Sequence, residues 1–212
     1  MVQDLNSQPI YSMREVAQYL QIPITTLRSW TSGINPLIKM ADPETKSLSF
    51  LNIIEAHVLS SLRRDEVKMS RIRPAIDYLA KVLKTEHPLA HIQLETDSVD
   101  IFIKQSNDYL NISKSGQMAI KEALKDYLKM VRRDEKGNPV RLFPLDTRGR
   151  DQEETVFIDP KVCFGRMVIK EQGIPVDALS ERLDAGDTLE ELSEDYGIEK
   201  EVIKRAIIRF AA

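Results

Sequence analysis

The chain has 212 residues, of which 42% are hydrophobic and 30% are charged, and its formal net charge is −3. This composition supplies enough apolar side chains for one or two globular cores, while no apolar run approaches the roughly 20 residues needed to span a bilayer. With a single cysteine and three histidines, the chain has no intramolecular disulfide and no CxxC metal knuckle, so we expect no metal site and no cofactor.

The first residues have neither a basic start nor an apolar signal core, so we expect a cytoplasmic protein with no membrane partner. The charge is unevenly distributed. Residues 1–85 hold 11 Lys and Arg against 8 Asp and Glu, whereas residues 156–212 hold 8 against 12. A basic N-terminal part before an acidic C-terminal part indicates that only the former meets phosphate groups.

The N-terminal part begins with the pattern of two short helices. Ser12 followed by Glu15 predicts a capping box and a helix as far as about Leu20. Pro23 fits the first turn of a second helix, whose apolar residues Ile24, Leu27 and Trp30 recur at the spacing of one buried face. Two helices with so short a link predict a helix-turn-helix.

The second helix is the expected reading element for DNA. Thr25, Thr26, Arg28 and Ser29 are predicted to point away from the apolar stripe. Such side chains reach phosphates and base edges from the major groove.

A turn around Asp42, Pro43 and Glu44 follows, between two short β-prone runs. It predicts a hairpin in the position of a wing, with Lys39 and Lys46 on or near it as further DNA contacts. Two amphipathic helices then cover about residues 50–66 and 70–84. His57, on the first of them, is expected at the surface or partly buried.

The motifs EVAQYL, TTLRSW and LSFLNIIEAHVL, over about residues 10–84, resemble the DNA-binding head of the MerR family. The resemblance implies that the second helix and the wing contact DNA. The chain departs from MerR regulators in having no long dimerising coiled coil directly afterwards. A packed helical bundle with its arginines on a solvated face remains the alternative interpretation.

Residues 86–145 form a middle segment with a mixed pattern. Short β-prone runs lie between residues 89 and 112, a helix is predicted over 117–134, and a Gly-Asn-Pro turn at residue 137 precedes a last strand. This segment either extends the head or builds a dimer interface. Residues 146–155 contain no apolar side chain, so we predict a linker and a domain boundary there.

Residues 156–212 predict two short strands, VFI and MVI, and then three short helices arranged like a second helix-turn-helix. Gly186 ends the first helix, Asp187 or Thr188 caps the second, and Gly197 ends it. Acidic residues crowd the middle helix and would repel phosphate. We therefore expect this part to bind a protein partner or to dimerise.

The patterns IDPKVCFGRMVIK, LDAGDTLEELSEDY and VIKRAI closely resemble the bacterial domain-of-unknown-function 433 family, which occurs in antitoxins of type II toxin-antitoxin pairs. Nearly the whole chain resembles the VapB-like antitoxins that join such a domain to a winged helix-turn-helix head. The resemblance implies two activities: repression of the shared operon and neutralisation of a PIN-like ribonuclease toxin.

The sequence therefore predicts a mainly α protein with small β elements: a winged helix-turn-helix over 1–85, a small α+β segment over 86–145, a linker over 146–155 and a small helical domain over 156–212. We expect it to bind double-stranded DNA as a homodimer, because repressors usually match a two-fold operator. Arg148 and Arg150 are candidates to enter the acidic active site of the toxin, where a guanidinium replaces the charge of a metal ion.

Two other functions compete with this prediction. One is a MerR-like transcription regulator without a toxin partner. The other is an enzyme, but the glycines form neither of the common nucleotide-binding loops. Cys163 has no histidine nearby in sequence, which favours a buried thiol over a nucleophile. We therefore predict a protein that is not an enzyme.

Overall fold

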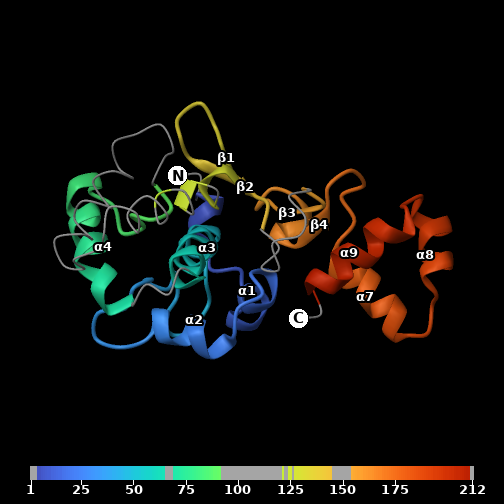
Figure 1. Ribbon diagram of the computed structural model, residues 1–212, viewed down its shortest axis with the longest axis horizontal. Helices are drawn as coiled ribbons and strands as arrows, with labels where there is room; N and C mark the ends of the chain where they lie inside the picture. The colour runs from blue at the N-terminus through green and yellow to red at the C-terminus, as the bar shows by residue number, and fades with distance from the viewer. Residues whose placement is uncertain are drawn as a thin grey trace.

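The computed structural model describes residues 4–64, 69–91, 121, 124–125, 127–144 and 154–210 (Figure 1). These residues are mainly helical and include a small antiparallel sheet, which confirms the predicted fold class at that level. The strands expected between residues 92 and 112 lie outside the described residues. Where the chain is described, none of its helices combines the length and the apolar character needed to cross a membrane.

The helices before the sheet follow the sequence pattern closely. Over residues 4–83 they are a 3-10 turn η1 (Leu5–Ser7), α1 (Met13–Tyr19), α2 (Ile24–Thr31), α3 (Phe50–Arg64) and α4 (Met69–Leu83). Residues 127–129, just before the sheet, are helical too. The helices after the sheet are α7 (Val176–Asp184), α8 (Leu189–Tyr196) and α9 (Lys200–Phe210), which extend to one side in Figure 1.

The predicted helix ends are present. Ser12 and Glu15 form the capping box of α1: the Ser12 hydroxyl accepts from the backbone N–H of Glu15, and the Glu15 carboxylate accepts from that of Ser12 at 2.8 Å. Thr188 and Glu191 repeat this arrangement at the start of α8, which Gly197 ends in the left-handed conformation at φ 63°. Local sequence therefore determines where these helices begin and end.

The sheet consists of β1 (Val131–Arg133), β2 (Pro139–Leu142), β3 (Val156–Ile158) and β4 (Met167–Ile169), each antiparallel to the next. The prediction of helix as far as residue 134 is wrong for β1, because residues 131–133 pair with β2 across the predicted turn. Leu142 of β2 pairs with Ile158 of β3. The sheet thus joins the two sides of residues 146–155, where a domain boundary is expected.

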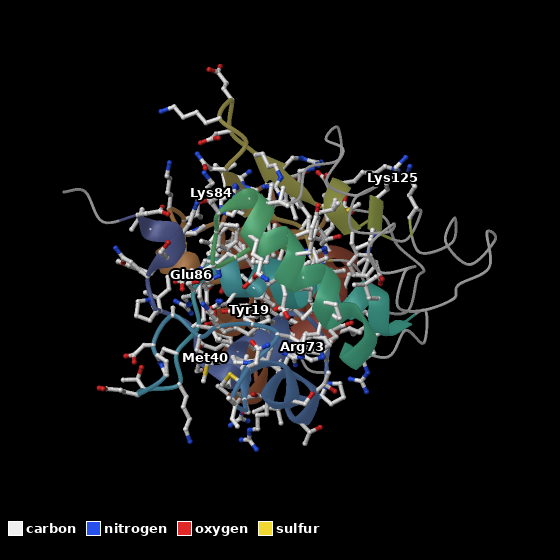
Figure 2. All side chains as sticks on the ribbon, turned by 90° about the vertical axis from the view of Figure 1, so that its left-hand side faces the viewer. Tyr19, Met40, Arg73, Lys84, Glu86 and Lys125 are labelled. Atoms are coloured by element: carbon white, nitrogen blue, oxygen red, sulfur yellow. The ribbon has the colours of Figure 1, made fainter. Side chains whose placement is uncertain are left out.

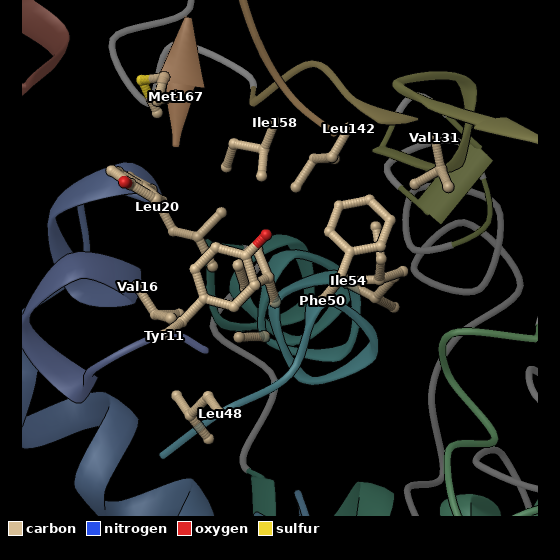
Figure 3. Close-up of a cluster of buried hydrophobic side chains, with 14 of the residues drawn as sticks. Tyr11, Val16, Leu20, Leu48, Phe50, Ile54, Val131, Leu142, Ile158 and Met167 are labelled. Atoms are coloured by element: carbon tan, nitrogen blue, oxygen red, sulfur yellow. The ribbon is translucent and has the colours of Figure 1, made fainter. Parts of the chain in front are cut away.

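Helix α3 forms the centre of the hydrophobic core. Phe50 and Ile54 of this helix are buried together with Leu142 of β2 and Ile158 of β3, as Figure 3 shows. On the other side of α3 lie the buried side chains of α1 and of the segment before it, Tyr11 among them. The N-terminal helices and the sheet therefore share one core.

Residues 50–59 of α3 are all buried, and three polar side chains are among them: Asn52, Glu55 and His57. The expectation for His57 is wrong. Its ring is only 2% exposed, lies 4.7 Å from the ring of Tyr127, and places Nε2 3.1 Å from the Tyr127 carbonyl oxygen. Burial lowers the pKa of His57 to about 4. The helix containing Tyr127 covers a face of α3 that the sequence pattern assigns to solvent.

Candidate nucleic-acid interface

The two helices of the head are joined by a tight connection. The backbone N–H of Ile22 donates to the Ala17 carbonyl at 3.0 Å, and Gln21 adopts a positive φ of 52°. Pro23 stands at the N-cap of α2, and the N–H of Thr26 donates to its carbonyl at 2.8 Å. This turn connects α1 to α2, whose Leu27 and Trp30 are buried in the core.

Three of the four candidate reading residues on α2 lie where the sequence predicts. Thr25, Arg28 and Ser29 are exposed, while Leu27 and Trp30 are buried. The Ser29 hydroxyl donates to the Thr26 carbonyl within the helix at 2.6 Å, which leaves its oxygen free to accept a bond. The exposed face of α2 therefore offers one guanidinium and two hydroxyl groups.

Thr26 does not belong to that face. It is only 9% exposed, and its hydroxyl accepts a hydrogen bond from the Arg63 guanidinium of α3. Thr26 precedes Trp30 by four residues, so both side chains lie on the same side of the helix. The prediction of an outward Thr26 is wrong, and this residue holds α2 against α3.

A hairpin follows α2 in the expected place. Asp42 and Ser47 exchange two backbone hydrogen bonds of 3.1 and 3.0 Å. The Asp42 carboxylate accepts from the Thr45 hydroxyl at 2.7 Å and from the Glu44 N–H at 2.9 Å, and the Thr45 bond lowers the pKa of this carboxyl. Lys46 is exposed and adopts a positive φ of 57°. The turn is closed by its own side chains and presents Lys46 to solvent.

Lys39, the other cation expected near the hairpin, has an acidic partner. Its Nζ lies 2.9 Å from a carboxylate oxygen of Glu86, and both side chains are largely exposed. An exposed pair of this kind is weak, so a phosphate can compete for the lysine. Figure 2 shows Glu86 beside the end of α4, on the same side of the molecule as Met40.

Two backbone groups at the base of the hairpin are held by the buried Asn52. Its side-chain oxygen accepts from the Ala41 N–H at 3.1 Å, and its amide donates to the Lys39 carbonyl at 2.7 Å. The neighbouring Glu55 carboxylate lies 3.0 Å from Nδ1 of His87. Desolvation raises the pKa of Glu55 although His87 opposes this effect. The hairpin is thus fixed to α3 by polar groups inside the core.

The sequence pattern assigns no role to Arg63 and Arg73, two of the arginines in the region of the two long helices. Arg73 of α4 donates to the carbonyl of Asn35 in the loop after α2, and Figure 2 shows it beside that part of the head. Together with Arg63 it ties α2 and its loop to the two long helices. A pattern of basic residues on helices does not distinguish such supporting contacts from DNA contacts.

The C-terminal helices carry the expected acidic residues, several of which are paired. Arg182 bridges Asp187 at 2.5 Å and Asp195 at 2.7 Å, and Lys200 pairs with Glu190. These pairs reduce the negative charge around α8 without making it positive. Arg148 and Arg150 lie outside the described residues, so their expected role in toxin binding remains a prediction.

The last helix touches the first. The Gln18 side-chain amide donates to the Phe210 carbonyl at 2.5 Å, and the Phe210 ring lies 6.3 Å from that of Tyr19. Beside this contact is an open cavity of about 410 Å³, bounded by Arg14 and Ile24 among others. The end of α9 therefore lies next to the beginning of α2, so the two terminal parts of the chain meet beside the candidate reading helix.

Comparison with known proteins finds a family that matches the C-terminal residues and relatives that match nearly the whole chain. Residues 156–211 match the family described as "Protein of unknown function (DUF433)". The chain is 29% identical over 231 aligned positions to the Mycobacterium tuberculosis protein named "Putative antitoxin VapB45", covering 96% of this chain and 95% of that protein. A second relative from the same organism, "Uncharacterized protein Rv2308", is 23% identical and is covered over 92% of its length.

A solved structure has the same fold. The crystal structure of Rv2018 from Mycobacterium tuberculosis superposes with a TM-score of 0.73 at 26% identity, covering 94% of this chain and 97% of that one. The likeness to the named antitoxin therefore extends beyond the matched family segment, through the head as well as the C-terminal helices. The chain is antitoxin-like in sequence over nearly its whole length.

Proposed function

We propose that this protein is a non-enzymatic antitoxin of a type II toxin-antitoxin pair, acting in the cytoplasm, which represses its own operon and neutralises a PIN-like ribonuclease. The observation that carries the proposal is the full-length likeness to a protein named as an antitoxin. A transcription regulator that has no toxin partner is the competing function.

DNA binding is assigned to the head as a winged helix-turn-helix. Thr25, Arg28 and Ser29 are exposed on α2, and Lys46 is exposed at the hairpin. We propose that these residues reach the major groove and the adjacent phosphates, with Lys39 as a further contact once Glu86 releases it. Thr26 is left out of this set because Arg63 already occupies its hydroxyl.

The protein is proposed to bind its operator as a homodimer, because one small head gives limited affinity and two heads match an inverted repeat. The C-terminal part is proposed to bind the toxin. Its α8 carries acidic residues and disfavours a second contact with DNA. Arg148 and Arg150 remain the proposed groups for the acidic active site of the nuclease.

Co-expression in a host cell tests both halves of the proposal. The gene of the proposed PIN-like nuclease is induced alone, with the full-length protein, and with the Arg148→Ala, Arg150→Ala double variant. We expect the full-length protein to restore growth and to repress a reporter placed behind its own promoter. Growth arrest that persists, together with intact repression, would favour the regulator without a toxin.

A further inference from the structure

The exposed face of α2 has an arginine from another helix at each of its two edges. Residues three or four apart on a helix are neighbours on its surface. Ile24 therefore lies at the Arg28 edge of this face, and Thr26 lies at the Ser29 edge. Figure 1 shows α1 to one side of α2 and α3 above it. A side chain from each of these two helices reaches one edge of the face.

Arg14 of α1 lies at the edge marked by Ile24. It borders an open cavity of about 410 Å³ whose other walls include Pro23 and Ile24, at the start of α2. Arg14 is exposed, and it makes no hydrogen bond or ion pair with any residue that the structure describes. Its positive charge is therefore available to a ligand that approaches the exposed face of α2.

Arg63 of α3 lies at the edge marked by Thr26. Its guanidinium donates one hydrogen bond to the Thr26 hydroxyl, which fixes the charged group beside α2. A guanidinium carries five N–H donors, and Arg63 is exposed, so donors remain for a second partner. Within the described part of the chain, no carboxylate pairs with Arg63. A guanidinium that is already held in place loses less conformational freedom when it binds a ligand.

The surface around these two arginines is positive, although the chain as a whole has a net charge of −3. Glu15 is the one acidic residue in the sequences of α1 and α2, and its carboxylate accepts a hydrogen bond from the Ser12 N–H at 2.8 Å. Arg14 and Arg28 outweigh this charge, and Lys46 is exposed at the hairpin. A ligand that complements this face is an anion, and one that reaches both edges of α2 is a polyanion.

We propose that Arg14 and Arg63 bind phosphate groups on the two DNA strands that border the major groove, one on each side of α2. The inference rests on the proposed DNA binding by the head and adds to it two contacts outside the reading helix. A helix in the major groove lies between two sugar-phosphate backbones, so cations at its two edges meet phosphates of different strands. Such contacts set the position and orientation of α2 on the duplex, whereas Thr25, Arg28 and Ser29 contact the bases.

The salt dependence of binding tests this assignment. The affinity of the full-length protein is measured for a duplex containing its own promoter and for an unrelated duplex of equal length, over a range of salt concentrations. Arg14→Gln and Arg63→Gln each remove one charge, and glutamine at position 63 keeps a donor for the Thr26 hydroxyl. We expect each variant to weaken binding to both duplexes roughly tenfold. Each should also reduce the slope of log K against log salt by about one unit for every bound head.

Two kinds of control accompany these variants. Arg14→Lys and Arg63→Lys keep the charge that a phosphate contact needs, so we expect them to retain the wild-type slope. Lys136→Gln removes an exposed charge from the turn between β1 and β2, which lies at the opposite end of the head from α2 in Figure 1. It should bind both duplexes as the wild type does.

Ethylation interference identifies the strand that each arginine contacts. Ethylation of a phosphate weakens binding wherever a side chain of the protein contacts that phosphate. Within each half-site, we expect Arg14→Gln to lose this sensitivity at phosphates of one strand and Arg63→Gln to lose it at phosphates of the other. Loss on both strands in either single variant would show that α2 has moved as a whole, and would overturn the assignment.

The outcomes distinguish this inference from the proposed function. If the wild type binds the promoter duplex and the glutamine variants keep its slope, the two arginines do not bind phosphate, although DNA binding by the head stands. Lysine variants as weak as the glutamine variants would assign the arginines a structural role and overturn the inference too. If the wild type binds neither duplex, the proposed DNA binding fails and the inference fails with it. Because Arg14 is exposed and unpaired among the described residues, Arg14→Gln should keep the wild-type melting temperature and tests the inference even if Arg63→Gln does not fold.

Discussion

Gly165 lies against the hydroxyl group of Tyr11, so closely that a Cβ on the glycine would stand 2.2 Å from the tyrosine oxygen. The contact joins the N-terminal segment to the connection between β3 and β4. The Tyr11 hydroxyl is buried and has no hydrogen-bond partner among the described residues. Desolvation accordingly raises the pKa of Tyr11 above its ordinary value. Tyr11 and Gly165 therefore meet in a close van der Waals contact, and the Tyr11 hydroxyl makes no hydrogen bond to a described residue.

Substitution of Gly165 should destabilise this junction. Gly165→Ala forces a side chain onto Tyr11 and onto a backbone at φ 81°, so we expect a loss of about 2–4 kcal/mol in the free energy of unfolding. Gly173→Ala is the matched control, because Gly173 has a φ of 66° and open space around it, and should lose only about 1 kcal/mol. Urea denaturation measures both. Equal losses would mean that the contact with Tyr11 is not tight.

Removal of the Tyr11 hydroxyl should leave stability unchanged or raise it. A buried hydroxyl without a partner costs free energy, which Tyr11→Phe recovers. The same change also enlarges the space beside Gly165, so Gly165→Ala should lose less stability in the Tyr11→Phe background. A double-mutant cycle measures this coupling. If the changes in the free energy of unfolding caused by the two substitutions add, the Tyr11 hydroxyl is not in close contact with position 165.

Arg28→Ala should weaken operator binding. If the guanidinium hydrogen-bonds a base, the loss of binding free energy is about 1–3 kcal/mol and is confined to the operator. If it contacts a phosphate, the loss is similar for all DNA sequences. Lys204→Ala, on the exposed side of α9, removes the same charge far along the chain and serves as the control. Gel-shift titration on operator and unrelated DNA separates the cases. Unchanged affinity for both would exclude α2 as the reading helix.

The stability of the protein should depend on pH through His57. Burial lowers the pKa of this group in the folded protein to about 4, below the value of 6.5 expected when unfolded. As the pH falls from 6.5 towards 4, His57 is protonated in the unfolded chain but stays neutral in the folded protein. The free energy of unfolding therefore decreases. The loss from this residue reaches about 3 kcal/mol.

The comparison of wild type with His57→Gln isolates this effect. Glu55 acts in the opposite direction, since its raised pKa means that the folded protein takes up a proton first as the pH falls. The glutamine variant lacks the imidazole but keeps Glu55, so its stability should decrease less below pH 6.5. Urea midpoints at intervals of pH provide the test. Parallel curves for the two proteins would contradict a buried neutral His57.

Much of the local structure could be predicted from the sequence, because helix ends are set by neighbouring residues. Ser12 with Glu15, and Thr188 with Glu191, cap their helices as their spacing predicts. The hairpin around Asp42 likewise depends on contacts within six residues. Arg28 is exposed as predicted because it lies opposite the buried stripe of α2.

The errors concern contacts between distant parts of the chain. Thr26 was assigned to the exposed face of α2, although its partner Arg63 comes 37 residues later. The burial of His57 depends on Tyr127, 70 residues away. The exposed Phe164 resembles any core phenylalanine in the sequence, and only the positive φ of the turn explains its position. Periodicity reports which residues share a face, whereas the element that covers each face is set by the tertiary fold.

Silencing of a nuclease by this protein is measured most directly as cleavage of a labelled RNA by the proposed PIN-like nuclease. Full-length protein is titrated into a fixed amount of the active nuclease, with the Arg148→Ala, Arg150→Ala double variant in parallel. We expect cleavage to stop near one protein chain per nuclease chain and to continue in the presence of equal amounts of the variant. Cleavage that proceeds unchanged in a tenfold excess of the wild-type protein would contradict this expectation.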